Sequence, residues 1–427
     1  MNARRVTAIL LAALLLALPV GCAQAQTDAS DGARGGPGIE PVSTASVGGG
    51  SGTTNLMAGI TAQRVSARAA SQAERAATVD FAFRLLKQTK KEGENALISP
   101  LSVLAALGMT ANGARGGTLV QMEQTLGLSS AELNNLIHAC RVTAEDDPLR
   151  MANAIWFRDA VDFTPEPAFL QTNADWYGAG AYRAPFDASI RREINDWVSV
   201  HTGGRIPGIL DRAPTDADMI LVNALAFDGT WEQSFRKEDV VKRDFIREDG
   251  IRQAADFMSG SVDVYLENDK ATGFIKPYAG GYTFAALLPK AGVTVDDLVA
   301  SLDGAALQAL TESARRLDVD VALPRFRTEF SADLRQALSA MGMTDAFTQS
   351  ADFSGISAGL YISAVLHKTF LEVDEKGTCA AAAAAVIMNR KAALTEKKTV
   401  RLDRPFVYLI QRDGVPVFLG TLMDAEG

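Results

Sequence analysis

The sequence is poor in the residues that carry most catalytic chemistry. Its 427 residues include only three histidines, at positions 138, 201 and 367, and three cysteines. It has no HExxH zinc signature, no metal-spaced cluster of cysteine and histidine, and no phosphate-binding G-x-x-x-x-G-K-[ST] loop. These absences argue against zinc hydrolases and P-loop enzymes. They predict a chain without catalytic residues, bound metal or cofactor.

Positive charge is also in deficit. The chain carries 42 Lys and Arg against 51 Asp and Glu, which gives a formal net charge of −9. A broad basic field for binding nucleic acid is therefore absent, and no nucleic-acid partner is expected. Because 47% of the residues are hydrophobic, the chain has enough apolar material for a large core. It is expected to be a monomer.

The amino terminus has the order of a secretory signal. A basic start precedes an apolar run at residues 6–20, which is too short for a membrane-spanning helix of about 20 residues. Two cleavage sites compete: residues 23–25 (AQA) suit ordinary signal peptidase, whereas the segment before Cys22 resembles a lipobox. Residues 1–25 are therefore predicted to be a signal peptide, or a lipoprotein signal that ends at Gly21. The mature protein is then secreted, or anchored to the membrane of the cell envelope through a lipidated Cys22.

Residues 26–75 are predicted to be a flexible linker. They are rich in Gly, Ser, Thr and Ala, with GGGSG at positions 48–52. Such a composition buries too little apolar surface to fold. Beyond the linker, Cys140 and Cys379 are too few to make a disulfide scaffold for so long a chain.

The folded domain is predicted to span residues 76–427 as an α+β structure. Helical signals dominate its first part: apolar residues three and four apart at 79–86, Ser99-Pro100 at the start of a second helix, and a third helix at 118–126 before Gly127. Runs rich in β-branched and apolar residues dominate its later part. Further helices are predicted at 164–175 and 190–202, and strands at 219–227, 282–288, 319–323, 360–365 and 406–410.

One segment fits neither a core helix nor a core strand. Residues 377–391 read GTCAAAAAAVIMNRK, and alanine alone favours a helix. However, a partly alternating, strand-like stretch at 366–375 precedes this segment, and Pro405 leads into another strand after it. A connection of this length between two strands usually has a function.

The start of this connection carries a family resemblance. Glu375-Lys376-Gly377-Thr378, followed by Cys379 and alanines, resembles the hinge of inhibitory serpins, where an acidic residue, any residue, Gly, Thr and Glu precede small side chains. Other blocks resemble segments of the same family: 95–102, 112–114, 117–118, 152–156, 194–198, 222–224, 229–231 and 403–406. The chain is therefore identified, from about residue 76 to 425, as a member of the serpin family.

The resemblance implies the serpin fold, with helices packed on three β-sheets and an exposed reactive-centre loop at about 376–402. It implies a serine protease inhibitor, not an enzyme, that acts as a suicide substrate. The protease cuts the loop and stays bound as a covalent acyl-enzyme while the loop inserts into the main sheet. The implied hinge residues are Glu375, Gly377, Thr378, Cys379, Ala380, Ala381, Ala382, Ala383 and Ala384. The residues implied in sheet opening are Ser99, Ser102, Asn223, Trp231, Arg325 and His367.

The resemblance also implies which side chains of the inserted hinge strand enter the protein. Thr378 and every second residue after it point inward, so small side chains are needed there. Cys379, where the family usually has Glu, points to solvent. Glu375 is expected to form an exposed ion pair with Arg325, worth about 0–1 kcal/mol.

The family spacing also predicts the bond that is cut. Counting 16 positions from Glu375 gives Lys391-Ala392, a basic site that suits trypsin-like proteases, whose pocket holds a carboxylate. Arg390 is an adjacent alternative. Counting back from Pro405 gives Leu394 instead, which suits chymotrypsin-like or elastase-like enzymes, and Met388 is a further candidate.

Two other functions remain open at this point. The first is a non-inhibitory serpin with a binding or chaperone role, although such members usually carry bulky or charged hinge residues. The second is a penicillin-recognising serine hydrolase, because Ser234 and Lys237 form an S-x-x-K pair. That family also needs S-D-N and K-T-G elements, which this sequence lacks.

Overall fold

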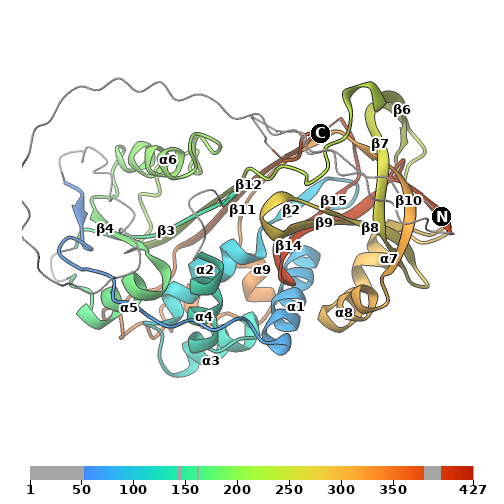
Figure 1. Ribbon diagram of the computed structural model, residues 1–427. Helices are drawn as coiled ribbons and strands as arrows, with labels where there is room; N and C mark the ends of the chain where they lie inside the picture. The colour runs from blue at the N-terminus through green and yellow to red at the C-terminus, as the bar shows by residue number, and fades with distance from the viewer. Residues whose placement is uncertain (1–51, 142–146, 161–162, 379–395, 427) are drawn as a thin grey trace, which may run out of the picture. The chain divides into compact units, whose positions relative to one another are not determined.

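The strands of the protein form two hydrogen-bonded sheets, and helices pack against them (Figure 1). The computed structural model describes residues 52–141, 147–160, 163–378 and 396–426, all within the unit Pro41–Gly427. The mixture of helices with large mixed sheets confirms the predicted α+β class. Within these ranges no helix combines the length and apolar character that a membrane span requires.

The first sheet has six strands and holds the central apolar run of the sequence. The strand at residues 219–227, one of the two central strands of this sheet, is buried along its whole length, as the continuous run of apolar residues predicts. The strand order is β1 (Thr54–Asn55), β4 (Gly180–Ala184), β3 (Leu149–Arg158), β5 (Met219–Phe227), β12 (Ala364–Val373) and β11 (Phe326–Asp333).

The second sheet has nine strands and combines two of the three sheets that the resemblance implied. The long strand β7 (Arg252–Glu267) pairs with strands on both of its edges, so continuous hydrogen bonding through β7 joins those two sheets into one. The order is β13 (Lys397–Arg401), β10 (Arg315–Pro324), β7, β8 (Ala271–Pro277), β9 (Tyr282–Pro289), β14 (Phe406–Arg412), β15 (Val415–Leu422) and β2 (Ala96–Ile98), with β6 (Val240–Ile246) also on β7.

Helices cover both faces of the six-stranded sheet. In Figure 1 helix α6 lies on one side of β3, and α2 and α5 lie on the other. The helices are α1 (Gln72–Thr89), α2 (Pro100–Ala111), α3 (Gly116–Leu126), α4 (Ser130–Arg141), α5 (Pro167–Tyr177), α6 (Ile190–His201), α7 (Val295–Ala300), α8 (Gly304–Glu312) and α9 (Arg335–Ala340), with 3-10 turns at Lys237–Asp239, Ala279–Gly281 and Asp345–Phe347.

Alternation along β5 divides its apolar side chains between two cores. Ile220, Val222 and Ala224 pack under α6. Met219, Leu221, Leu225 and Phe227 belong to the main core, where α1 and α2 lie. Residue 223 of the same strand shares this second face, so a polar residue, Asn223, lies among apolar neighbours of the main core.

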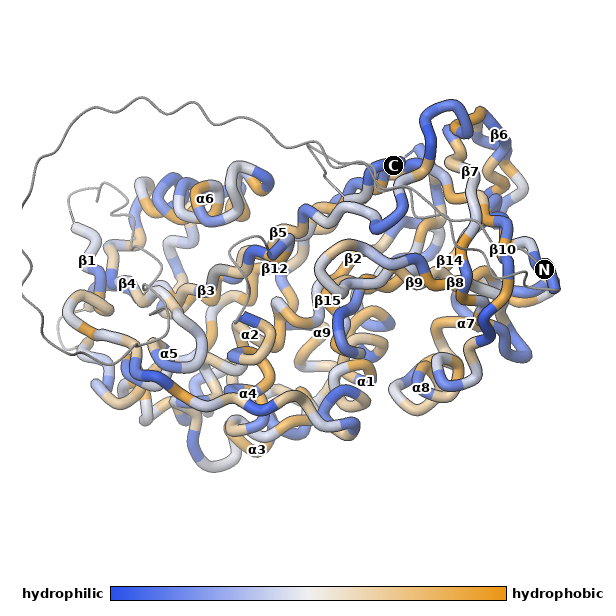
Figure 2. The backbone as a smooth tube through the Cα atoms, viewed as in Figure 1, coloured by the Kyte–Doolittle hydropathy of each residue, from blue (hydrophilic) through white to orange (hydrophobic). Residues whose placement is uncertain are grey.

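Helix α2 begins where the sequence predicts it. The Ser99 hydroxyl accepts a hydrogen bond from the backbone N–H of Ser102 at 3.3 Å, and Pro100 occupies the first turn. Every residue of α2 is buried, and the helix is coloured mainly hydrophobic in Figure 2. A helix that is apolar all round belongs inside a large core, which fixes the Ser99 end beneath the six-stranded sheet.

The structure differs from the sequence prediction at the start of the domain. The composition predicts a linker at residues 26–75, but within the described part of that range Thr54 and Asn55 pair with β4, and helix α1 begins at Gln72. The Asn135 side chain accepts the N–H of Arg68 at 2.8 Å. The composition of this stretch did not reveal these contacts, because its partners lie far along the chain.

Two other local predictions were wrong. The strand expected at 360–365 begins only at Ala364 and continues to Val373. Residues 397–401 lie within the predicted exposed loop at about 376–402, but they form strand β13, which pairs in parallel with β10. Helix α4 was not predicted at all.

We expect part of the acid sensitivity of the protein to come from the first turn of α1. The hydrogen bond from Arg68 lowers the pKa of the buried Glu74 carboxyl to about 2, although burial opposes this shift. A carboxyl with a lowered folded-state pKa stabilises the protein above its unfolded value of about 4.5, and this stabilisation is lost as the pH falls toward 2. Glu74→Gln should therefore lower the melting temperature at pH 6, and the difference from the parent should shrink between pH 4.5 and 2. Glu92→Gln, at an exposed loop position, is the control; a constant difference for Glu74→Gln would contradict the prediction.

Candidate functional site

The site is the seam between strands β5 and β12 in the six-stranded sheet. These strands pair in parallel through only three residue pairs, from Ala364 opposite Ile220 to Leu366 opposite Val222. On their other edges, β5 pairs with β3 through nine residue pairs and β12 with β11 through eight. Past Val222 and Leu366 the described strands form no ladder with each other. Their facing backbone groups there are available to an additional strand.

A tight turn follows β12 and reverses the chain toward this seam. The Asp374 N–H donates to the Gly377 carbonyl at 2.9 Å. The Asp374 carboxylate accepts the N–H groups of Lys376 at 2.8 Å and Gly377 at 3.0 Å. As a result, Thr378 lies antiparallel and opposite Val373, and the chain is directed back along the edge of β12.

Thr378 already lies between the two sides of the seam. Its N–H donates to the Gly229 carbonyl at 2.7 Å. Its hydroxyl lies 2.6 Å from the Tyr278 hydroxyl, and the residue is fully buried. Gly377 permits this approach, because it has a φ of +149° and a Cβ there would lie 2.1 Å from the Gly229 oxygen.

Trp231 holds the turn in place. Its ring stacks on Tyr278 with centroids 4.0 Å apart. Its indole N–H donates to the Asp374 carbonyl at 2.9 Å, and its backbone N–H donates to the Lys376 carbonyl at 2.9 Å. The turn and the start of the hinge are therefore fixed from the β5 side by one aromatic residue and its backbone.

The predicted ion pair is present, but it is not exposed as expected. The Arg325 guanidinium lies 2.8 Å from the Glu375 carboxylate, whose side chain is only 10% exposed. The N–H of Phe235 also donates to the Glu375 carbonyl at 2.9 Å. Burial of the carboxylate makes the pair more sensitive to the loss of Arg325 than a surface pair would be.

A row of polar side chains crosses the underside of the seam. Asn153 of β3, Asn223 of β5 and His367 of β12 lie at positions that face the main core, and all three are buried. The Ser102 hydroxyl donates to the Asn223 side-chain oxygen, and the Asn223 amide donates to that of Asn153. These contacts connect α2, β5 and β3 across an otherwise apolar layer.

His367 connects β12 to the same helix. Its Nε2 accepts the backbone N–H of Ser99 at 3.1 Å, so the imidazole is neutral at this nitrogen. Complete burial lowers the pKa of His367 to about 4. The side-chain nitrogen of Asn153 is buried and lacks a hydrogen-bond partner in the described part of the chain. The row is therefore incompletely satisfied in this arrangement of the sheet.

The structure brings together Ser99, Ser102, Asn223 and His367 in one row, and Trp231, Arg325, Glu375, Gly377 and Thr378 at the turn. Sequence reasoning did not assign a role to Asn153, Tyr278, Gly229 or Asp374. Alternation along its strand could have indicated that Asn153 faces the core, whereas no sequence pattern indicated the role of Tyr278. Outside the described residues lie Cys22, Cys379, Ala380, Ala381, Ala382, Ala383, Ala384, Met388, Arg390, Lys391, Ala392 and Leu394.

The candidate serine-hydrolase motif does not form a site in the described residues. Ser234 and Lys237 are both exposed, and no hydrogen bond joins them. A G-x-S-x-G string at 355–359 lies in a run of turns instead of between a strand and a helix, so it lacks the geometry of a nucleophile elbow. Neither sequence pattern therefore has the structural context that its chemistry needs.

Known proteins match nearly the whole folded part. A sequence model of the family described as Serpin (serine protease inhibitor) matches residues 76–425. A leukocyte elastase inhibitor A of Mus musculus is 32% identical over 79% of this chain and 95% of its own length. An uncharacterised serpin-like protein of Thermococcus kodakarensis is 33% identical over 81% of this chain and 84% of its own.

Solved structures agree with these relatives. The native state of the thermophilic serpin tengpin superposes with a TM-score of 0.81 at 39% identity, covering 87% of this chain and 100% of that one. A thyroxine-binding globulin in complex with thyroxine has a TM-score of 0.74 at 25% identity, covering 82% and 99%.

We expect His367 to make the intact protein less stable in mild acid. The folded protein keeps the imidazole neutral down to a pKa of about 4, whereas the unfolded chain takes up the proton near 6.5. Stability is therefore lost as the pH falls from 6.5 toward 4, by roughly 2 kcal/mol between pH 7 and 5. His367→Gln, which can still accept the Ser99 N–H, should lose less over this interval in urea unfolding. His201→Gln, on the surface helix α6, should behave as the parent; equal pH dependence in all three proteins would refute the assignment.

Proposed function

Because the chain belongs to the serpin family, whose members are mostly protease inhibitors, we propose that it inhibits serine proteases by inserting its cleaved reactive-centre loop between β5 and β12. The observation that carries the proposal is the three-pair parallel ladder between these strands. It leaves most of both edges available, next to a turn that already directs the chain into the space between them.

Insertion adds one strand that is antiparallel to both of its neighbours. The loop leaves β12 through a reversing turn, so it runs opposite to β12, and β5 is parallel to β12. Each new backbone hydrogen bond contributes about 1 kcal/mol net, so a dozen would favour insertion by on the order of 10 kcal/mol. Alanines suit this strand because larger side chains would clash on its inward face.

The chemistry is that of an interrupted proteolysis. The protease serine attacks the carbonyl carbon of Lys391, an ester bond forms, and the peptide bond to Ala392 breaks with release of the new amino group on Ala392. Hydrolysis of the ester would complete the cleavage. Insertion pulls the attached protease along the sheet and distorts its active site, so that the ester persists.

The basic pair Arg390-Lys391 favours trypsin-like proteases as targets, because their specificity pocket places a carboxylate against the side chain before the cut bond. Leu394 and Met388 would direct the inhibitor to proteases with apolar pockets. The hinge composition supports inhibition over a purely binding role, because six consecutive alanines follow Cys379 and none of them hinders insertion.

Mixing the protein with trypsin should give a covalent complex that survives boiling in SDS. The complex should contain the protease joined to the amino-terminal fragment, and a small carboxy-terminal peptide should be released. Mass spectrometry of that peptide identifies the cut bond, with Ala392 as the expected first residue. Elastase and chymotrypsin are tested in parallel. Cleavage by all of these proteases without any stable adduct would contradict the proposed function.

Thr378→Glu should convert the inhibitor into a substrate. Thr378 is fully buried between Gly229 and Val373, and an unpaired charge there costs several kcal/mol. Trypsin should cut the variant at the parental rate without forming the complex. The nicked parent should melt at a higher temperature than the intact parent, whereas the nicked variant should not. Cys379→Glu is the matched control, because alternation along the inserted strand would place it on the opposite face; loss of complex formation in both variants would refute this account of the inward face.

A further inference from the structure

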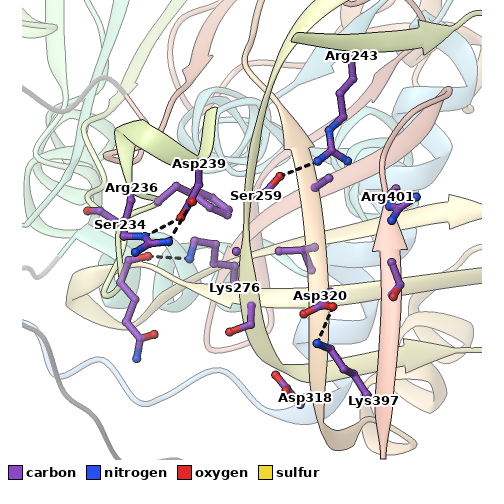
Figure 3. Close-up of a pocket in the computed structure, with 17 residues that line it drawn as sticks. Ser234, Arg236, Asp239, Arg243, Ser259, Lys276, Asp318, Asp320, Lys397 and Arg401 are labelled. Atoms are coloured by element: carbon purple, nitrogen blue, oxygen red, sulfur yellow. Dashed lines mark hydrogen bonds and ion pairs between the residues drawn. The ribbon is translucent and has the colours of Figure 1, made fainter. Parts of the chain in front are cut away.

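A buried lysine lies behind the turn and takes no part in the mechanism above. Lys276 of strand β8 is only 4% exposed. It lines a cavity of about 590 Å³ between β8, the segment at 233–236 and the strands β6, β7, β10 and β13. Figure 3 shows this cavity with the side chains that surround it.

The ammonium group of Lys276 lacks a counter-charge in the described residues. Its Nζ donates to the Gln233 carbonyl at 2.7 Å. It also lies over the rings of Phe235, at 4.3 Å from the centroid, and Trp231, at 5.3 Å. These contacts orient the charge but do not neutralise it, and no described carboxylate forms an ion pair with it.

This arrangement is unfavourable for folding alone. Burial lowers the pKa of Lys276 to about 8, which shows that its surroundings disfavour the charged form. An unbranched apolar residue such as methionine would fill the same space without that cost. A residue that breaks a folding rule without compensation is a candidate for a functional role.

The remaining charges around the cavity favour an anion over a cation. Two of the three carboxylates are already occupied: Asp239 pairs with Arg236 at 2.6 Å, and Asp320 pairs with Lys397 at 2.9 Å. The third, Asp318, also acts electrostatically on Lys397.

The remaining basic groups are not neutralised in this way. Arg243 of β6 makes only a long hydrogen bond to Ser259, at 3.5 Å, and Arg401 of β13 is exposed. Neither forms an ion pair within the described residues. Together with Lys276, three cations from three different strands therefore face one cavity without carboxylate partners.

We infer that this cavity binds a small multivalent anion, such as a di- or tricarboxylate or a phosphate, with Lys276 as its buried contact and Arg243 and Arg401 at its mouth. The anion supplies the counter-charge that the fold omits. The volume of the cavity lies within the range of small-molecule sites. Charge-assisted hydrogen bonds from an ammonium group and two guanidinium groups to an anion are strong.

The position of the site gives the bound anion a consequence that depends on the proposed function. Trp231 and Phe235, which contact Lys276, also hold the hinge turn through Lys376 and Glu375. Arg401 belongs to β13, the strand at the far end of the reactive-centre loop. An anion that contacts both Lys276 and Arg401 connects the two ends of the reactive-centre loop and should slow spontaneous insertion of the loop.

Binding is tested on the full-length protein by isothermal titration calorimetry with citrate and, separately, inorganic phosphate, at pH 7 and constant ionic strength. We expect saturable binding of at least one anion, and Lys276→Met should weaken it about tenfold or more. Lys242→Met is the matched control, because Lys242 is an exposed lysine of β6 that pairs with Asp256 and lies outside the cavity lining. Equal affinity in the parent and Lys276→Met, or a heat no larger than that of sodium chloride, would overturn the proposal.

The pH dependence gives a second readout that needs no variant. Citrate affinity should fall as the pH rises from 7 through 9, because the Lys276 amine then loses its proton. The other charged groups facing the cavity are Arg236, Arg243, Lys397 and Arg401 with Asp239, Asp318 and Asp320. Arginine and carboxylate groups do not titrate in this interval, and Asp320 raises the pKa of Lys397. Affinity that does not change with pH would exclude Lys276 as the contact.

Thermal stability separates the site from a general salt effect. Lys276→Met should melt above the parent at pH 7, and this difference should shrink as the pH rises past 8 and the parental amine becomes neutral. Citrate should raise the melting temperature of the parent and of Lys242→Met, but not of Lys276→Met. None of these measurements requires protease inhibition, so failure of the anion site and failure of the proposed function are distinguishable.

Discussion

The incomplete ladder between β5 and β12 is the constraint on which the rest of the structure depends. Three parallel residue pairs hold the strands at one end, and beyond them each strand has one edge that the other does not satisfy. Unsatisfied backbone edges normally invite association with another chain. Here the turn at Asp374–Gly377 reverses the chain after β12 and brings Thr378 opposite Val373 at this opening. Under the proposed function, the segment that follows Thr378 completes the sheet at this interruption.

The polar row beneath the seam replaces part of the apolar packing there with hydrogen bonds. A continuous apolar layer would lock β5 to the core, because separating packed methyl groups leaves a cavity. Asn153, Asn223 and His367 exchange part of that packing for hydrogen bonds to the start of α2. Hydrogen bonds are directional and can be exchanged between partners, so strands above them can move relative to α2 with less loss than apolar contacts would suffer.

The sequence predicted the elements that local chemistry determines. Ser99-Pro100 marked the start of α2, the continuous apolar run at 219–227 marked the buried strand β5, and the hinge pattern led to the correct family. The sequence did not predict contacts between residues that lie far apart along the chain. The contacts of residues 52–71 depend on partners such as Asn135 and β4. Likewise, Tyr278 and Gly229 contact Thr378 only because β8 and the end of β5 meet at the turn. Periodicity reports which side of an element is buried, but not which distant residue it will face.

The position of Thr378 has a kinetic consequence. Forming a new strand usually requires a slow first step, in which chain entropy is lost before any hydrogen bond compensates for it. In the proposed mechanism that step precedes cleavage, because Thr378 already donates its backbone N–H to Gly229 and forms a bridge with Val373. What remains after cleavage is elongation, one residue after another, from an existing nucleus. Under the proposed function, the fraction of protease that is trapped depends on two rates, the rate of strand growth and the rate of ester hydrolysis, and the contacts that Thr378 has already formed favour strand growth.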